Sequence, residues 1–404
     1  MMKQMFVIAL VGVFLGVGIV ADAAEAPKTI KVGSSCSLTG PFGSGGAMCK
    51  AGYEIAIEHI NEGGGVFVKE FKKRIPLELV LLDDESNFTL TVSRMESLFT
   101  THNVVAYLGG FSSPMHAAQA PIAEKNKVPI LMVATYLYSV HQKGYKYNFS
   151  PFPKSPDCAK GVFDILDSIP AAQKPKKVAI FMEKAPVGVE LGDMWKDESV
   201  KHGYGEALFK DQPREMKDFS PLIMEAKSAG AEILLTGPTT PEGITMTKQM
   251  KELDYNPKFY FAYRAPDPMA WAQALGRDGD YVVLGPGWCY NFKYPGVAEL
   301  NESHMKKFHR QSDVITGPAY ACVQALANAI EKAGTLNREK VRDALAATDM
   351  KTVIGPLKFR PDGTGVVIYI GVQWQRGKQE IVWPKEYATA PLVYPAPKWS
   401  ERKL

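Results

Sequence analysis

The fold is decided by residues 104–132, VVAYLGGFSSPMHAAQAPIAEKNKVPILM. The apolar run Val104–Leu108 predicts a strand, the Gly/Ser-rich segment Gly109–Pro114 a turn, Met115–Lys127 a helix, and Pro129–Met132 a second strand. A strand, helix and strand in this order predict two parallel strands joined by a crossover helix. Ligands of such sheets bind beyond the carboxyl ends of the strands, so the turn Gly109–Pro114 is a candidate site, together with the turn Ser35–Gly46 that follows the first strand of the chain.

The same alternation extends toward the N-terminus. A strand, a helix, a strand and a helix are predicted, in this order, at Thr29–Ser35, Ala47–Asn61, Leu77–Leu82 and Leu90–Thr101. Together with residues 104–132 they form one βαβ series, which predicts a parallel sheet covered by helices on both faces.

A second series follows the Pro-rich stretch Ser150–Pro156, which is the first expected crossover between two domains. Its predicted strands are Lys177–Phe181, Ala207–Phe209, Ile233–Thr236 and Phe259–Phe261, and its helices are Val189–His202, Phe219–Ser228 and Glu242–Leu253.

The helical block beyond Gly285–Gly287 is expected to pack back on the first sheet, because it is too small to be a third domain. Its helices are predicted at Val297–Gln311, Ala319–Lys332 and Arg338–Ala347. A further crossing is placed at Gly355–Phe359, a final strand at Val366–Val372 and an irregular tail from Trp383 to Leu404.

The N-terminus has the pattern of a secretory signal peptide. Lys3 precedes an apolar run from Met5 to Val20, and the small residues Ala21–Ala24 follow. The run is shorter than the roughly 20 residues of a membrane-spanning helix. We therefore expect residues 1–24 to be removed and the mature chain to be a soluble periplasmic protein, an uncleaved anchor being the alternative.

Composition and cysteine usage exclude several classes of protein. With 46% hydrophobic and 22% charged residues the chain is globular rather than disordered, and its length predicts two domains. The formal charge of +4 is scattered, unlike that of a nucleic-acid-binding protein. Five cysteines have no metal-like spacing. Either Cys36 and Cys49 form a disulfide or the cysteines are buried free thiols.

No catalytic motif is present, so we expect neither an enzyme nor a cofactor. Residues 43–48 lack the third glycine of a dinucleotide fingerprint, and a Walker lysine, a GxSxG elbow and an HExxH pair are all missing. His304 and His309 are five residues apart and would not share a metal on a helix. The carboxylates Asp83–Glu85 are expected to form a solvated turn that begins a helix.

Eight short segments, in order and with matching spacing, resemble the Leu/Ile/Val-binding family of type I periplasmic binding proteins. These segments are Ile30–Gly33, Leu38–Pro41, Gly52–Ala56, Ile60–Gly64, Asp83–Asp84, Gly109–Ser113, Val128–Ile130 and Gly355–Leu357.

The resemblance covers nearly the whole mature chain and implies an α/β fold of two doubly wound parallel-sheet lobes joined by a three-strand hinge. One lobe would contain residues 28–149 and 290–354, the other 150–289 and 355–404. A monomer would close on a small-molecule carboxylate. Its partners would be the permease and the ATPase of an ABC importer in the inner membrane.

The resemblance also implies which residues bind the ligand. Ser113 matches the serine that holds the ligand's carboxylate, with Ser112 and Phe111 beside it, and Ala134, Thr135 and Tyr136 match the loop whose backbone contacts the ligand. The alternative for Ser113 is a helix cap. Thr239 and Arg264 match two ligand-contacting positions of the second lobe.

Several positions depart from the family pattern. Gly45 and Val187 replace tyrosines, which predicts a larger cleft, and Ser86 and Ser112 stand where some relatives have a disulfide. Arg264 replaces the acidic residue that receives an amino acid's ammonium group. We therefore expect a carboxylate without an α-ammonium group, for example an aromatic or dicarboxylic acid, packed on Tyr136 or Phe111. In the alternative, Arg264 points to solvent and Asp267 receives an amine.

Two other functions remain open from the sequence. A ligand sensor could use the same clamp to control a signalling partner. An α/β enzyme with an unrecognised site is the third hypothesis, and the export signal and the missing motifs argue against it.

Overall fold

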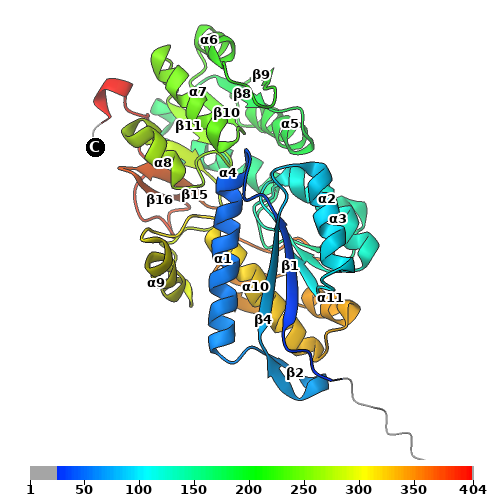
Figure 1. The fold of residues 1–404 in the computed structure, drawn as a ribbon. Coiled ribbons are helices and arrows are strands. Elements are labelled where there is room, and N and C mark those ends of the chain that lie inside the picture. Colours follow the sequence, from blue (N-terminus) through cyan, green and yellow to red (C-terminus); the bar gives the residue numbers. More distant parts are fainter. Residues whose placement is uncertain (1–24, 403–404) are drawn as a thin grey trace, which may run out of the picture.

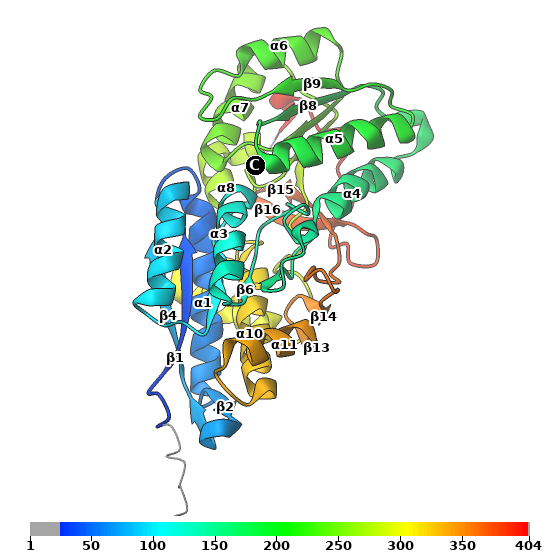
Figure 2. The same cartoon turned by 90° about the vertical axis from the view of Figure 1, so that its right-hand side faces the viewer.

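The computed structural model describes residues 25–402, so the expected signal peptide lies outside the described residues. The chain forms two α/β lobes, each built on its own sheet (Figures 1 and 2). No helix in the described part of the chain is long and apolar enough to cross a membrane.

The first lobe contains a five-stranded parallel sheet with strand order β4-β1-β5-β6-β7. Its strands are β1 (Ile30–Cys36), β4 (Leu77–Asp83), β5 (Ala106–Leu108), β6 (Ile130–Leu131) and β7 (Asn148–Phe149). Its helices are α1 (Gly43–Glu62), α2 (Phe88–Thr100), α3 (Ser113–Asn126), α9 (Val297–Phe308), α10 (Thr316–Ala333) and α11 (Arg338–Ala346). A small ribbon of β2 (Val66–Val68) and β3 (Lys73–Ile75) closes one end.

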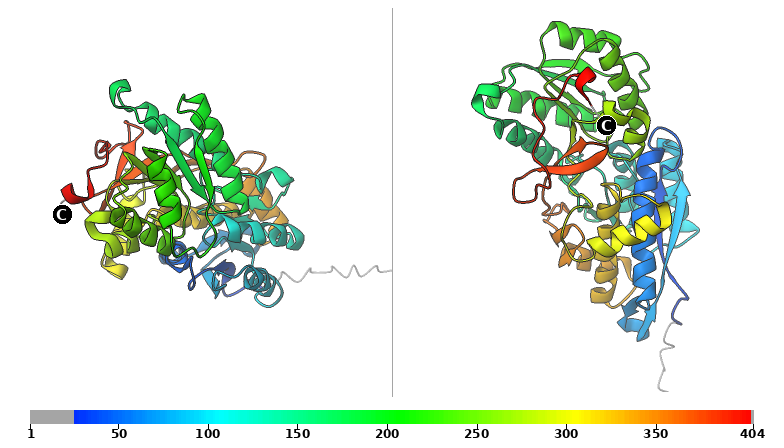
Figure 3. Two further views of the ribbon diagram at one scale, coloured as in Figure 1. Left: turned by 90° about the horizontal axis from the view of Figure 1, so that it is seen from above. Right: turned by 90° about the vertical axis from the view of Figure 1, so that its left-hand side faces the viewer.

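The late helical block packs on this lobe, as its size predicted. Helix α10 lies against α1, although the second sheet separates them in sequence. The right view of Figure 3 shows α9 and α10 beside the blue α1.

The second lobe contains a seven-stranded sheet with order β16-β15-β12-β11-β10-β8-β9. Five strands are parallel: β8 (Val178–Met182), β9 (Leu208–Asp211), β10 (Ile233–Thr236), β11 (Phe259–Ala262) and β12 (Val282–Leu284). An antiparallel hairpin of β15 (Gly371–Gln375) and β16 (Lys378–Trp383) extends one edge. The helices are α4 (Ser155–Asp167), α5 (Pro186–Lys201), α6 (Ser220–Ser228), α7 (Thr240–Glu252) and α8 (Ala270–Leu275).

Short 3₁₀ turns connect some of these elements, at Lys69–Phe71, His141–Lys143, Ala171–Gln173, Gly276–Gly279 and Trp399–Glu401.

The chain crosses between the lobes three times, after β7, after β12 and before β15. The sequence predicts the third crossing at Gly355–Phe359, and this prediction is wrong. Residues Gly355–Lys358 form β14, which pairs with β13 (Asp349–Thr352) in a hairpin packed near α10. The lobe boundary at residue 355 therefore falls inside this hairpin, and the chain crosses over residues 359–370.

The end of the chain also differs from the prediction. The strand expected at Val366–Val372 begins only at Gly371, and β16 was not predicted. The first and third crossing segments pair with each other at Ser150 and Thr364. Ser150 N–H donates to Gly363 O (2.9 Å) and Gly365 N–H to Ser150 O (2.8 Å). The hinge is therefore a connected structure rather than separate linkers.

The expectation of a solvated turn at Asp83–Glu85 is wrong for Asp84, which is fully buried. The Ser35 and Ser37 hydroxyls donate to its carboxylate, at 3.0 and 2.6 Å, and Ser86 N–H donates at 3.2 Å. Asp84 thus fixes the carboxyl end of β1 to that of β4.

We predict that Asp84→Ala lowers the free energy of unfolding by about 2–4 kcal/mol, because buried donors left without a partner cost about 1–3 kcal/mol each. Urea denaturation measures this. The control is Asp349→Ala, since Asp349 is exposed and its ion pair with Lys358 (2.8 Å) is worth about 0–1 kcal/mol. Equal losses in the two variants would contradict the role of Asp84.

Candidate functional site

A cavity of about 20 Å³ lies between the lobes, beyond the carboxyl ends of the strands. It has room for about one water molecule. Six of the eight predicted site residues line it: Phe111, Ser112, Ser113, Ala134, Tyr136 and Arg264. Phe152, Tyr263 and Asp267 complete the wall.

Ser113 is the first residue of α3, and its hydroxyl joins two loops of the first lobe. Neither Ser112 nor Ser113 makes a side-chain capping bond to the helix. Instead, the Ser113 Oγ accepts hydrogen bonds from Tyr136 N–H (3.1 Å) and from the Thr135 hydroxyl (3.3 Å). The Ser113 proton therefore remains available for a hydrogen bond to an acceptor in the cavity.

The loop after β6 contributes an aromatic wall. The Tyr136 ring makes edge contacts with Phe152 and Tyr263, at centroid distances of 5.5 and 5.8 Å. Its hydroxyl donates to Gly285 O in the second crossing segment. Thr135 does not line the cavity and acts through its hydrogen bond to Ser113.

Phe111 accounts for the glycine at position 45. A Cβ atom on Gly45 would lie 2.2 Å from the Phe111 ring, so the ring occupies the space that a side chain there would need. Val187 is also buried. The prediction that Gly45 enlarges the cleft is therefore wrong, because the Phe111 ring fills the space, whereas the prediction for Val187 stays untested.

Arg264 is buried, and the alternative that it points to solvent is wrong. Its Nε donates to Pro238 O (3.2 Å), and its Nη2 to Glu183 Oε1 (3.2 Å) and to Gly237 O. Its Nη1 reaches across to the Ser112 hydroxyl of the first lobe (3.4 Å). The guanidinium therefore spans the cleft, and Nη1 has a further N–H that can donate to a ligand.

A row of charges extends from Arg264 toward the surface. Glu183 also accepts a bond from Arg214 Nε (3.1 Å), so two guanidinium groups share one carboxylate. Arg214 in turn stacks over the Phe88 ring of the first lobe at 5.0 Å. Glu242 also lies near Arg264, so this row contains two carboxylates for its two guanidinium groups.

Asp267 is 6% exposed and lines the cavity opposite Ser113. Among the described residues, its carboxylate receives no hydrogen bond. Burial raises the pKa of Asp267 well above its ordinary value. The charge of Arg264 opposes this rise, and the charge of Asp313 adds to it. Asp267 is predicted from the sequence only as the alternative partner of an amine, although its position in the loop after a parallel strand is a signal for a ligand site.

Thr239 lies outside the cavity. Its N–H and hydroxyl both donate to the Glu242 carboxylate at 2.8 Å, at the start of α7. It lines a second pocket of about 460 Å³ at the cleft mouth, between Phe42 and Ser86 of the first lobe and Arg214 of the second.

The cysteines are buried free thiols in this structure, so the Cys36–Cys49 disulfide is not formed. Within residues 25–402, no group of three or more His, Cys, Asp or Glu residues could hold a metal ion.

Comparison with known proteins agrees with this architecture. The family model described as periplasmic binding protein matches residues 29–379. The Leu/Ile/Val-binding protein homolog 7 of Brucella suis is 25% identical over 395 residues, covering 93% of this chain and 97% of its own.

Two solved structures have the same fold. A leucine-binding protein from Thermotoga maritima has a TM-score of 0.78 at 22% identity, covering 87% of this chain and 97% of its own. A solute-binding protein of an ABC transporter from R. palustris, in complex with benzoate, has a TM-score of 0.77 at 16% identity, covering 91% and 98%.

The relatives are binding proteins rather than enzymes, which confirms the expectation of a protein without catalytic activity. The chain belongs to the periplasmic binding protein family and has the type I fold of the Leu/Ile/Val-binding proteins.

Proposed function

We propose that the protein is the extracytoplasmic binding protein of an ABC importer and captures a small carboxylate between its lobes. The observation that carries this proposal is the interlobe cavity, with the Ser113 hydroxyl on one wall and the Arg264 guanidinium on the other. Export to the periplasm and delivery to a permease with its ATPase are part of the proposal.

The Arg264 guanidinium favours an anion in the cavity. It lines the cavity, whereas Arg214 does not, and the carboxylates of Glu183 and Glu242 lie near it on the second lobe. The raised pKa of Asp267 favours its neutral form. A carboxylate entering the cavity would therefore meet the Nη1 donor of Arg264 and the proton of Ser113, and charge-assisted hydrogen bonds are the stronger kind.

The aromatic side chains favour a ligand with a ring. Phe111, Tyr136, Phe152 and Tyr263 surround the polar groups of the cavity. A ring placed among them would bury apolar surface and make edge or stacked contacts. The benzoate complex of the R. palustris neighbour supports an aromatic acid as the first probe.

Binding in the cavity between Ser113 and Arg264 requires the lobes to separate first. A cavity of about 20 Å³ is too small for benzoate, and pockets for small molecules are typically about 300–1,000 Å³. The contacts that must open include Arg264 to Ser112 and Arg214 to Phe88. The first contact is long, at 3.4 Å, and the second is a single cation–π contact, which is compatible with a clamp that opens and closes around its ligand.

We predict that Ser113→Ala weakens binding of benzoate about ten- to a hundredfold, because a hydrogen bond to a charged group contributes about 1.5–3 kcal/mol. Isothermal titration calorimetry measures the change. The control is Ser228→Ala, at an exposed position at the end of α6. An unchanged dissociation constant in Ser113→Ala, with benzoate bound by the wild type, would remove Ser113 from the site.

We also predict that benzoate-type or dicarboxylic acids bind more tightly than leucine, phenylalanine or glutamate, and that Arg264→Ala reduces this preference at least tenfold. The cause is that a buried ammonium group beside a guanidinium loses its hydration without gaining an opposite charge. Titration of the whole panel against each variant measures the preference.

Arg214→Ala is the matched control, because Arg214 also pairs with Glu183 but lies outside the cavity. Its effect on binding should stay below about threefold. Micromolar binding of a free amino acid that survives Arg264→Ala and is lost in Asp267→Asn would instead assign the amine to Asp267.

A further inference from the structure

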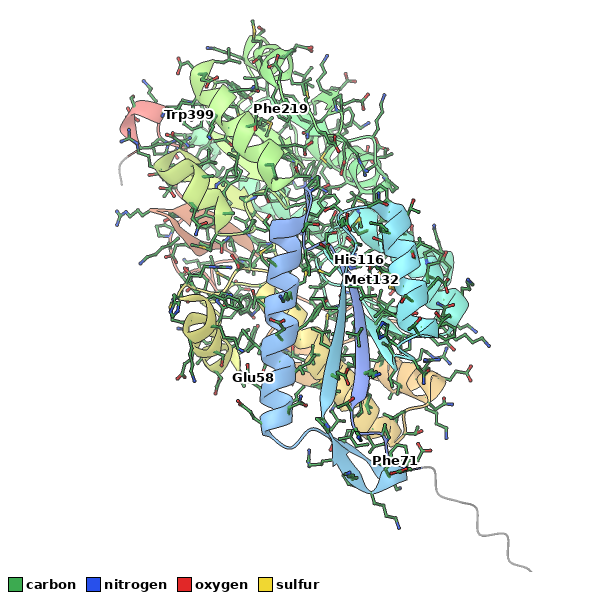
Figure 4. The ribbon with its side chains drawn as sticks, in the orientation of Figure 1. Glu58, Phe71, His116, Met132, Phe219 and Trp399 are labelled. Atoms are coloured by element: carbon green, nitrogen blue, oxygen red, sulfur yellow. The ribbon has the colours of Figure 1, made fainter. Side chains whose placement is uncertain are left out.

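Lys154 lies in the first crossing segment of the hinge and is buried. Its Nζ donates to Thr135 O (2.8 Å) and to the Ser150 hydroxyl (2.6 Å), which itself donates to Met132 O (2.7 Å). Figure 4 shows Met132 at the end of the first lobe that faces the second. One ammonium group therefore connects the hinge with the loop that lines the cavity.

The bond from Lys154 fixes a particular peptide group. The carbonyl of Thr135 and the N–H of Tyr136 belong to the same planar peptide and point in opposite directions. Lys154 holds the carbonyl from the hinge side, while the N–H donates to Ser113 on the cavity side. Rotation of this peptide would break both bonds and remove a donor from Ser113.

The groups that face Lys154 come from every element around it. They are Asp157 of α4, Glu190 of α5, Asp362 of the third crossing segment, Cys322 of α10, His116 of α3 and His141 of the 3₁₀ turn His141–Lys143. Figure 4 labels His116 and Met132 in the same part of the first lobe.

Burial lowers the pKa of both His116 and His141 to about 3, so both imidazoles are neutral near pH 7. Burial also lowers the pKa of Lys154 to about 7, although Asp157, Glu190 and Asp362 oppose the shift. Lys154 therefore changes its charge near neutral pH.

We propose that Lys154 is a positioning residue for ligand binding, whose protonated form holds the Thr135–Tyr136 peptide toward Ser113 and thereby makes carboxylate capture stronger below neutral pH than above it. This inference rests on the proposed function, because it needs an anionic ligand beside Ser113.

The sign of the pH effect follows from linkage. A carboxylate in the cavity stabilises the ammonium form of Lys154, so binding above pH 7 takes up a proton and affinity falls as pH rises, at most tenfold per pH unit. Asp267 would give the same sign, since an anionic ligand also favours its protonated form. The two residues must therefore be separated by mutation.

The test is calorimetric titration of benzoate between pH 6 and 9 in wild type, Lys154→Met, Lys154→Gln and Asp267→Asn. We expect weaker binding by at least tenfold at pH 6 in both Lys154 variants, with a flat pH profile between 6 and 8. Asp267→Asn should keep the wild-type fall over that range. A wild-type pH slope retained in Lys154→Met would overturn the inference.

Wild type alone supplies a second readout, because titration at pH 8 in two buffers of different ionisation enthalpy gives the number of protons taken up. We expect net uptake, and its absence would contradict the linkage even if the variants did not fold. If no carboxylate binds to wild type at any pH, the proposed function fails rather than the role of Lys154.

A readout without ligand also exists. Since the pKa of Lys154 is about 7 in the folded protein and about 10.4 in an unfolded chain, the unfolded state binds more protons between these values. The free energy of unfolding of wild type should therefore rise with pH from 7 to 10 relative to that of Lys154→Met. A difference that does not change with pH would show that Lys154 does not titrate in this range.

Discussion

The hydrogen bond from Tyr136 N–H to the Ser113 hydroxyl joins the loops that follow two neighbouring parallel strands, β5 and β6. It is formed because both strands end at the same edge of the sheet, where the turn Gly109–Ser113 and the loop after β6 meet. Because Ser113 Oγ accepts this bond and a second one from the Thr135 hydroxyl, its own proton remains available to a ligand. Lys154 supports the bond from Tyr136 N–H from behind, through the carbonyl of the same peptide. The site is thus a property of the hinge as well as of the first lobe.

The second lobe contributes the Arg264 guanidinium beside the ring of Tyr263. Arg264 has a positive φ of 74° and is held by two backbone carbonyls and by Glu183, so its guanidinium is fixed before any ligand enters. Because the side chain is already fixed, it loses little conformational entropy when it binds an anion. Because only Nη1 reaches the first lobe, at 3.4 Å, the direct polar link that Arg264 makes across the cleft is weak. A ligand carboxylate would give Arg264 a stronger partner than the Ser112 hydroxyl.

Strand and helix alternation predicted both sheets and the return of the helical block to the first lobe, because hydrophobic periodicity is a local signal. It misplaced the third crossing, since the apolar residues 366–370 lie in no strand and the hairpin β13–β14 precedes them. The partners of Asp84 and Lys154 are set by tertiary structure, so their burial could not be inferred from spacing. The positions of Ser113 and Arg264 followed from the resemblance, whereas the filling of the Gly45 space by Phe111 depends on side-chain packing that no pattern reveals.

Closure of the two lobes on a small carboxylate is the central claim, and small-angle X-ray scattering measures it directly. The radius of gyration should decrease when a saturating carboxylate is added to wild type, and it should decrease less when the same concentration is added to Ser113→Ala, which is then only partly occupied. Equal radii for free and ligand-saturated wild type, with binding demonstrated in the same sample, would contradict a hinged clamp.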